Sequence, residues 1–168
     1  MKQIKIILTT VVAFLLVSTT VVFNACNQDL CKDISCKNNG VCRDGSCNCS
    51  LGFEGPFCAT RTYEKFIGTY DGYYRCNGTN PKLRTLVISP DAQPNKVILY
   101  NIVETQDITL TGTVDGVNIT LDETTVGNHT YSGNGHIVDL DITLFIQDYY
   151  ALDSTTHTCT YNGNKFIK

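Results

Sequence analysis

Residues 31–58 read CKDISCKNNGVCRDGSCNCSLGFEGPFC and hold six of the nine cysteines of the chain. A segment this short cannot bury enough apolar surface to fold alone, and segments below about 40 residues usually need cross-links. Each disulfide typically adds about 2–4 kcal/mol of stability. The sequence therefore predicts a disulfide-held module that matures in an oxidising compartment, outside the cytosol.

A zinc site is the alternative use of clustered cysteines. Residues 26–58 contain no histidine, and the Cys47-x-Cys49 pair with its long flanking spacings suits tetrahedral zinc poorly. Disulfides are therefore the favoured interpretation.

The turn residues of this segment point to a family. Asn39-Gly40 stands before the third cysteine, where we expect Gly40 to supply a positive φ, and Gly52-Phe53-Glu54-Gly55 stands before the sixth. With the cysteine spacing, these motifs resemble an EGF-like domain over residues 31–58. The resemblance implies the pairs Cys31–Cys42, Cys36–Cys47 and Cys49–Cys58.

Some EGF-like domains bind calcium next to the first and third cysteines. The resemblance makes Asn27, Asp29 and Asp44 calcium candidates, but Leu30 stands where that motif has Glu or Gln. We therefore expect no metal site, and treat these side chains as ordinary solvated polar groups.

The first 25 residues have the pattern of an export signal. Lys2 and Lys5 form a basic start, and residues 6–23 are apolar apart from four threonines and a serine. This order is typical of a cleaved secretory signal peptide, which we assign to residues 1–25. The alternative is an uncleaved membrane anchor, which the threonines and the short length disfavour.

Cys26 is the odd cysteine of the chain, because six cysteines belong to residues 31–58 and Cys76 and Cys159 can pair. Its position after Ala25 resembles the lipobox of bacterial lipoproteins, although Phe23 and Asn24 depart from that motif. The resemblance implies that Cys26 becomes a lipidated N-terminus, with residues 26–30 as a tether. Several acyl chains would hold the protein firmly on a membrane. The alternative is ordinary cleavage, with Cys26 free or bridging two chains.

Residues 63–168 alternate apolar and polar residues with a period of two, which predicts an all-β domain. Short connections and the lack of a helical pattern favour antiparallel neighbours. The expected strands are 66–76, 83–89, 97–102, 108–114, 117–121, 126–132, 137–148 and 155–161.

Eight antiparallel strands can close into an up-and-down barrel, which leaves no exposed edge. Closure would place the first strand beside the last, so a Cys76–Cys159 disulfide would pin the seam. The alternative is a two-sheet sandwich with the same bridge.

Gly68-Thr69-Tyr70 is similar to the Gly-x-Trp signature of lipocalin-like barrels, with tyrosine in place of tryptophan. The opening residues 65–70 and closing residues 159–161 also resemble a domain of Bacteroidetes-type surface lipoproteins that often follows an EGF-like module. The resemblance implies a lipocalin-like barrel over residues 63–168, and no activity is established for that group of domains.

Candidate catalytic residues are few. Neither a nucleophile elbow, a phosphate-cradling glycine loop nor a His-Glu-x-x-His pair is present in the sequence. Asp122 and Glu123 follow Leu121 at the end of a predicted strand, where acids are common turn residues. We expect no catalytic residue and no cofactor.

The histidines offer a metal site only with a third ligand. His129 and His136 flank a predicted turn at residues 131–135 and would approach each other across it, with Asp139 or Asp141 as the further ligand. These acids alternate with apolar residues, which favours a solvated sheet face instead.

Tyrosine is the more informative residue type. Four tyrosines form two adjacent pairs that look exposed, and tyrosine suits sugar and protein surfaces. They are Tyr73, Tyr74, Tyr149 and Tyr150. The favoured interpretation is nevertheless that they are half-buried strand aromatics.

These features together predict a binding protein. The net charge of −3 and the scattered basic residues exclude a nucleic-acid partner. We expect a non-catalytic, exported lipoprotein on a bacterial outer membrane or cell surface, or a secreted one if Cys26 is not lipidated. Its EGF-like spacer would present the barrel to a protein or glycan. The alternative is a carrier of a small apolar ligand inside the barrel.

Overall fold

Three disulfides hold the first part of the chain in the computed structural model, which describes residues 29–103 and 108–166. They join Cys31 to Cys42, Cys36 to Cys47 and Cys49 to Cys58, which are the pairs that the EGF resemblance implies. The proposed signal peptide, Cys26 and Asn27 lie outside the described residues.

The disulfide-rich segment, residues 31–58, contains little regular structure. Strands β1 (Val41–Arg43) and β2 (Ser46–Asn48) form one short hairpin, and β3 (Phe53–Glu54) pairs with β4 (Thr60–Arg61). Leu51 and Phe57 are exposed, whereas Cys58 is fully buried. Sulfur therefore supplies the cohesion that buried hydrocarbon supplies in a larger domain.

Gly40 is needed for a different reason from the one that the sequence suggested. Its φ is not positive; the left-handed conformations fall on Asn38 and Asn39, at φ 50° and 60°. A Cβ on Gly40 would lie 2.7 Å from the Cys58 Sγ. The glycine therefore makes room for a disulfide. Gly52 and Gly55 do have positive φ, as expected of turn residues.

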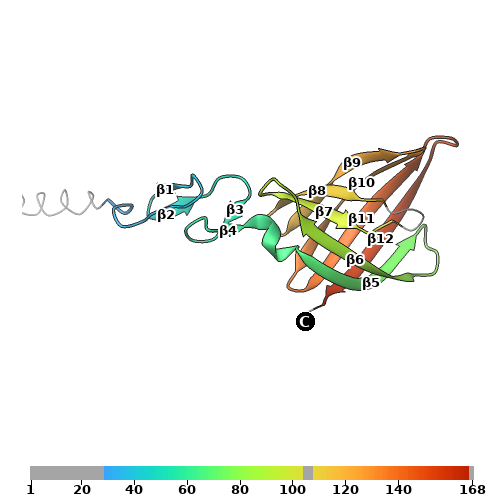
Figure 1. Ribbon diagram of the computed structural model, residues 1–168, viewed down its shortest axis with the longest axis horizontal. Helices are drawn as coiled ribbons and strands as arrows, with labels where there is room; N and C mark the ends of the chain where they lie inside the picture. Colours follow the sequence, from blue (N-terminus) through green and yellow to red (C-terminus); the bar gives the residue numbers. More distant parts are fainter. Residues whose placement is uncertain (1–28, 104–107, 167–168) are drawn as a thin grey trace, which may run out of the picture.

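The rest of the chain forms a closed barrel of eight antiparallel strands, which confirms the predicted fold class and excludes the sandwich. Each strand pairs with its neighbours in sequence, and the last strand pairs with the first. The strands are β5 (Gly68–Cys76), β6 (Lys82–Pro90), β7 (Lys96–Tyr100), β8 (Leu110–Asp115), β9 (Asn118–Val126), β10 (His129–Val138), β11 (Asp141–Tyr150) and β12 (Thr155–Lys165). Figure 1 shows the barrel continuing in line from the disulfide-rich segment.

The predicted boundaries fail around β10. The turn expected at residues 131–135 is absent, because β10 runs unbroken through it from His129 to Val138. The real turns lie at Gly127, with φ 62°, and at Asp139, with φ 52°. Gly133 and Gly135 suggested a turn, but a Cβ at either would collide with a carbonyl oxygen of β11. They are glycines of close strand approach.

Asp122 and Glu123 lie in a β-bulge, contrary to the expectation that they follow the end of a strand. They lie within β9, not at a strand end, and together oppose Ser132 of β10, because Leu121 pairs with Gly133 and Thr124 with Tyr131. Because of the extra residue, Leu121 before the bulge and Thr124 after it both face the interior. Both acids are thereby turned to the outer surface.

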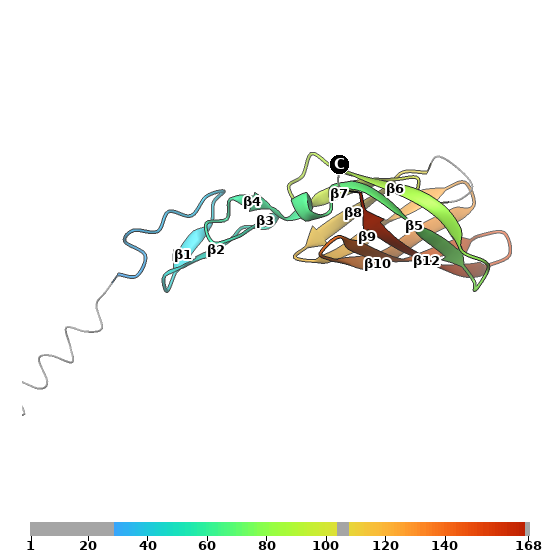
Figure 2. The ribbon, with the colours of Figure 1, turned by 90° about the horizontal axis from the view of Figure 1, so that it is seen from below.

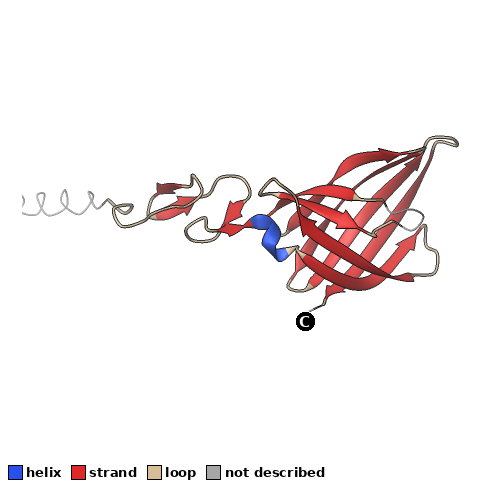
Figure 3. Cartoon of the chain, in the orientation of Figure 1, coloured by secondary structure: helices blue, strands red, loops and turns tan. Residues whose placement is uncertain are grey.

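The barrel interior is filled by large side chains. They come from every strand and include Tyr70, Leu86, Ile88, Leu99, Leu110, Ile119, Tyr131, Leu144 and Tyr161. Tyr63 and Phe66, on and just after the 3-10 helix η1 (Thr62–Lys65), belong to the same core. This helix lies between the disulfide-rich segment and the barrel, as Figure 3 shows in blue.

The seam between β5 and β12 closes the barrel. Cys76 and Cys159 are directly opposite each other and form a disulfide. Farther along, Gly72 faces Gly163, and a Cβ on Gly163 would lie 2.5 Å from the Tyr161 hydroxyl. Gly163 therefore leaves room for the Tyr161 ring, whose hydroxyl donates to the Tyr70 carbonyl at 2.8 Å, and Gly72 leaves room for the β12 backbone. Burial raises the pKa of Tyr161 to about 12, so this donor keeps its proton.

Contacts at the junction couple the two parts of the molecule. The Thr62 amide donates to the Gly52 carbonyl at 3.0 Å, and Lys65 pairs with Glu54 at 2.8 Å. A Cβ on Gly52 would lie 2.9 Å from the Pro94 carbonyl carbon, in the β6–β7 turn. The disulfide-rich segment therefore packs against the barrel end, and both views show the two in line (Figures 1 and 2).

Among the described residues, no helix has the length and apolar character to cross a membrane.

We predict that Gly72→Ala destabilises the barrel by about 3 kcal/mol, because its Cβ would meet the Asn162 carbonyl and lie 2.5 Å from the Gly163 Cα. Urea unfolding followed by far-UV circular dichroism measures the loss. Gly78→Ala is the control, since a Cβ there meets nothing within 4 Å and only its φ of +71° costs energy, about 1 kcal/mol. Equal losses in the two variants would contradict the close packing at the seam.

Candidate functional site

A shallow groove of about 440 Å³ lies on the outer surface of the barrel, across β5, β12 and β11. We call it the outer groove. The residues that line it are Asp71, Gly72, Tyr73, Leu83, Asp141, Ile142, Thr143, Asn162, Gly163 and Asn164. Gly72 and Gly163 have no side chains and Ile142 is buried inward, so backbone forms the floor while alternating polar side chains form the walls.

The strand register places these side chains in two parallel rows. In the first row, Tyr73 is opposite Leu83 on β6 and Asn162 on β12, and Asn162 is opposite Thr143 on β11. In the second row, Asp71, Asn164 and Asp141 lie side by side on β5, β12 and β11. Directly opposite residues of paired strands share one face, so both rows point outward.

Hydrogen bonds fix the polar members of these rows. Asn164 Nδ2 donates to Asp141 Oδ1 at 2.6 Å, and Thr143 Oγ1 donates to Asn162 Oδ1 at 3.1 Å. Thr85 Oγ1, on β6, likewise donates to Asp71 Oδ1 at 2.6 Å. The polar side chains of the groove are therefore held in position on a rigid sheet rather than on loops.

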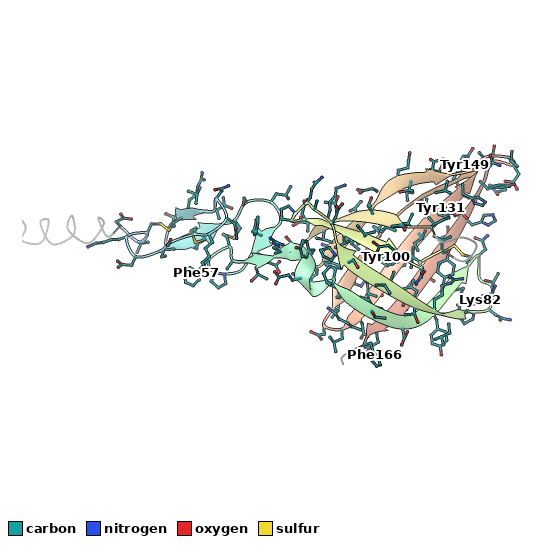
Figure 4. All side chains as sticks on the ribbon, in the orientation of Figure 1. Phe57, Lys82, Tyr100, Tyr131, Tyr149 and Phe166 are labelled. Carbon is teal, nitrogen blue, oxygen red and sulfur yellow. A yellow bond between two sulfur atoms is a disulfide. The ribbon has the colours of Figure 1, made fainter. Side chains whose placement is uncertain are left out.

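Tyr73 is the aromatic side chain of the outer groove. It is 59% exposed, whereas its neighbour Tyr74 is 3% exposed and belongs to the core. The favoured interpretation of the paired tyrosines as strand aromatics suits Tyr74, whereas Tyr73 is exposed, because adjacent strand residues face opposite sides. Tyr149 is 41% exposed and lies at the barrel end away from the disulfide-rich segment (Figure 4).

A second outer hollow, of about 340 Å³, lies above Gly133. Its lining includes Asn134 and Gln147 and the aromatic ring of Phe145, which is 43% exposed. Thr143 and Gln147 stand on either side of Phe145 along β11, so the two hollows follow one strand. Polar side chains with intervening aromatic rings thus extend along the outer face.

The structure separates the predicted histidine cluster. His129 and His136 lie on the same strand, β10, and His136 pairs in register with Thr143. His129 instead bonds Asp148 through Nδ1 at 2.8 Å, and its ring lies 4.7 Å from the Tyr150 ring centre at a tilt of 31°. Among residues 29–103 and 108–166, no group of three or more His, Cys, Asp or Glu side chains is arranged to hold a metal ion.

The acidic calcium candidates have local roles. Asp29 Oδ1 accepts a hydrogen bond from the Cys31 amide at 3.0 Å, which fixes the chain before the first disulfide. Asp44 occupies the turn between β1 and β2 with φ 48°. Both are ordinary turn functions of aspartate.

Asp122 forms a separate polar cluster across β7, β8 and β9. Its Oδ2 lies 2.7 Å from Lys96 Nζ and 2.7 Å from Thr111 Oγ1, and its Oδ1 accepts from Thr113. Partial burial acts to raise the pKa of the Asp122 carboxyl, but the hydrogen bonds and the Lys96 charge outweigh it and hold the pKa below its ordinary value. The Asp122 carboxylate has a lowered pKa and already accepts from several donors, so it is better suited to stabilising the fold than to accepting a proton during a reaction.

The outer groove was missed by sequence reasoning. Its residues come from strands that are distant in sequence, and each reads as an ordinary solvated strand position. The glycines within β5 and β12 mark the close approach at the seam, but they stand at inward-facing positions and do not reveal the groove on the outside.

Comparison with known proteins gives little further information. No protein-family model matches the chain, and a search of the curated proteins found no match. Among solved structures, a redesigned beta barrel is 12% identical to this chain, with a TM-score of 0.43; the match covers 66% of this chain and 98% of that one.

We predict that Asp122→Asn destabilises the barrel at pH 7 by up to about 1 kcal/mol, through loss of the Lys96 ion pair. A lowered pKa in the folded state gives stability that is complete above the unfolded pKa of about 4 and is lost as the pH falls through the folded pKa. The difference between wild type and variant should therefore shrink from pH 5 to pH 2 in urea titrations.

The matched control is Glu123→Gln, which removes the adjacent, exposed acid. We expect it to change the unfolding free energy by less than about 0.5 kcal/mol at any pH. A pH-independent loss in Asp122→Asn would show that the ion pair does not stabilise the fold.

Proposed function

We propose that this protein is a non-catalytic, exported lipoprotein of a bacterial cell surface or outer membrane. Its disulfide-rich segment, an EGF-like module, acts as a spacer, and its lipocalin-like barrel binds a protein or glycan on its outer surface. The observation that carries the proposal is the linear arrangement of segment and barrel, combined with a barrel interior that is occupied by its own side chains.

The linear arrangement suits presentation away from a surface. The first described residues lie at the end of the disulfide-rich segment that points away from the barrel (Figures 1 and 2). A lipid on Cys26 would join the chain a few residues before Cys31, and would therefore place the barrel on the far side of the spacer. The junction contacts of Thr62 with Gly52 and of Lys65 with Glu54 favour a fixed rather than a swinging connection.

The filled interior favours external binding over a carrier function. Tyr70, Tyr131 and Tyr161 are among the largest fully buried side chains of the barrel. Burial raises the pKa of Tyr70 far above its usual range, and its hydroxyl donates to the Phe66 carbonyl at 2.8 Å. A ligand inside would have to displace these rings and break their hydrogen bonds.

A small number of exposed aromatic side chains on rigid strands is a common basis for recognition. Tyr73 and Phe145 are such side chains on β5 and β11. Tyr73 stands between the exposed Leu83 of β6 and the polar Asn162 of β12, which suits a ligand with both apolar faces and hydrogen-bonding groups.

We predict that Cys26→Ala, expressed in the native host, loses the incorporation of an alkyne-tagged fatty acid that the wild-type protein shows. The acyl chains are attached at the Cys26 residue, so its removal removes them together. Cys76→Ala/Cys159→Ala is the control, because it removes two other cysteines and should remain labelled. Fatty-acid labelling that persists in Cys26→Ala would refute the lipid anchor at this residue.

We predict that Cys26→Ala protein purified from the same host carries no small apolar molecule. Native mass spectrometry should give the mass of the polypeptide with four disulfides and nothing more. A bound lipid or other apolar compound at one copy per chain would favour the carrier alternative instead.

A further inference from the structure

We propose that the outer groove binds a neutral oligosaccharide, with Tyr73 as the stacking platform and the polar rows as partners of the sugar hydroxyls. This inference rests on the proposed function, because it names the ligand class for the outer surface of the barrel. Four observations support it: the exposed ring, the paired donors and acceptors, the charge of the lining and the size of the groove.

The exposed ring gives the groove an apolar contact of the right kind. Tyr73 is 59% exposed beside Leu83, which is 72% exposed, and both belong to the first row. A pyranose ring presents a C–H face that packs on an aromatic face, while its hydroxyls point outward from the ring edge. A tyrosine at the edge of polar rows offers both contacts at once.

The polar rows offer acceptors and donors in alternation. Asp71 and Asp141 are acceptors, whereas Asn162 and Asn164 provide both a carbonyl oxygen and an amide group. In the hydrogen bonds found among the described residues, Oδ1 of each carboxylate is used, which leaves Oδ2 for a ligand. Sugar hydroxyls donate and accept together, so they match this mixture better than a purely anionic or purely apolar ligand does.

The charge of the lining selects a neutral sugar. Among the described residues that line the groove, two are carboxylates and none is a lysine, arginine or histidine. Two negative charges would repel the carboxylates of uronic or sialic acids and the sulfates of sulfated glycans. The same lining repels a phosphate-bearing ligand.

The size and shape suit a chain of a few sugars. The groove of about 440 Å³ lies within the range of ordinary ligand sites, and it is shallow and open along the barrel wall. The second hollow, beside Phe145, follows the same strand and can accommodate further sugars of the same chain. A stable protein partner would instead bury about 800 Å² per side, usually around an apolar centre.

The test uses the whole exported chain, extracted from its membrane in detergent. It is applied to an array of neutral hexasaccharides of glucose, mannose, galactose and xylose, with oligogalacturonate and hyaluronan fragments as acidic counterparts. We expect binding to at least one neutral hexasaccharide and none to the acidic fragments. Calorimetry with the best neutral hexasaccharide then measures the effect of substitutions.

Tyr73→Ala should weaken that binding at least tenfold, and Tyr73→Phe should retain it, because stacking needs the ring and not the hydroxyl. Asn164→Ala should also weaken it. Tyr149→Ala is the matched control, since it removes another exposed tyrosine outside the groove and should leave the affinity unchanged. Thermal unfolding of each variant verifies that the barrel is intact.

The outcomes separate this inference from the proposed function. Binding that is lost in Tyr149→Ala but kept in Tyr73→Ala overturns the groove assignment, yet leaves external binding intact. Absence of binding to every neutral hexasaccharide, or preference for acidic fragments or for a protein, also overturns the inference. Fatty-acid labelling that persists in Cys26→Ala would refute the lipid anchor at Cys26 independently of any glycan result.

Discussion

The pairing of β12 with β5 is the constraint on which the rest of the barrel depends. Without it, the eight strands would form an open sheet with two unpaired edges and an exposed apolar face. The pairing is secured by three features of one strand pair: the Cys76–Cys159 disulfide, the Gly72–Gly163 approach and the Tyr161 hydroxyl on the Tyr70 carbonyl. The disulfide closes a loop of 83 residues, which by loop entropy alone contributes about 4 kcal/mol.

Closure of the seam also determines where a ligand can bind. Tyr161 lies beside Gly163 inside the barrel and donates to the Tyr70 carbonyl, so the ring occupies space that a carrier would need for cargo. Gly72 and Gly163 stand at inward-facing positions, so the floor of the outer groove between the outward-facing rows is backbone. The seam therefore fills the interior and leaves ligand binding to the outer surface.

The two parts of the molecule are stabilised by different means. Residues 31–58 depend on three disulfides because their large apolar side chains remain mostly exposed. The barrel depends on a contiguous core of buried aliphatic and aromatic side chains. This difference fits a division of work in which a short, oxidised spacer carries a self-supporting domain.

Local pattern was sufficient to predict the all-β class, the eight strands and the closed barrel. Alternation of residues such as Ile142, Leu144 and Ile146 identifies a strand with one buried face. The pattern failed where one residue type has two uses. Gly133 and Gly135 resemble turn residues, but they allow two strands to approach closely, and Asp139 forms the turn instead.

The outer groove was beyond local pattern for a different reason. Asp71, Asp141 and Asn164 are separated by many residues and meet only through the strand register, which no short stretch of sequence specifies. Asp122 and Glu123 were likewise misplaced, since the bulge that contains them depends on the partner strand β10. Fold class follows from periodicity, but a site on a barrel wall follows from register.

Closure of the barrel at the seam is tested most directly by nuclear Overhauser spectroscopy of the isotope-labelled protein. Cross-strand contacts should join the backbone protons of Tyr73 with those of Asn162, and those of Asp71 with Asn164, and the β5 and β12 amides should exchange slowly with solvent. Absence of these contacts, with β5 and β12 amides exchanging as fast as those of an exposed edge, would contradict the closed barrel and everything inferred from its filled interior.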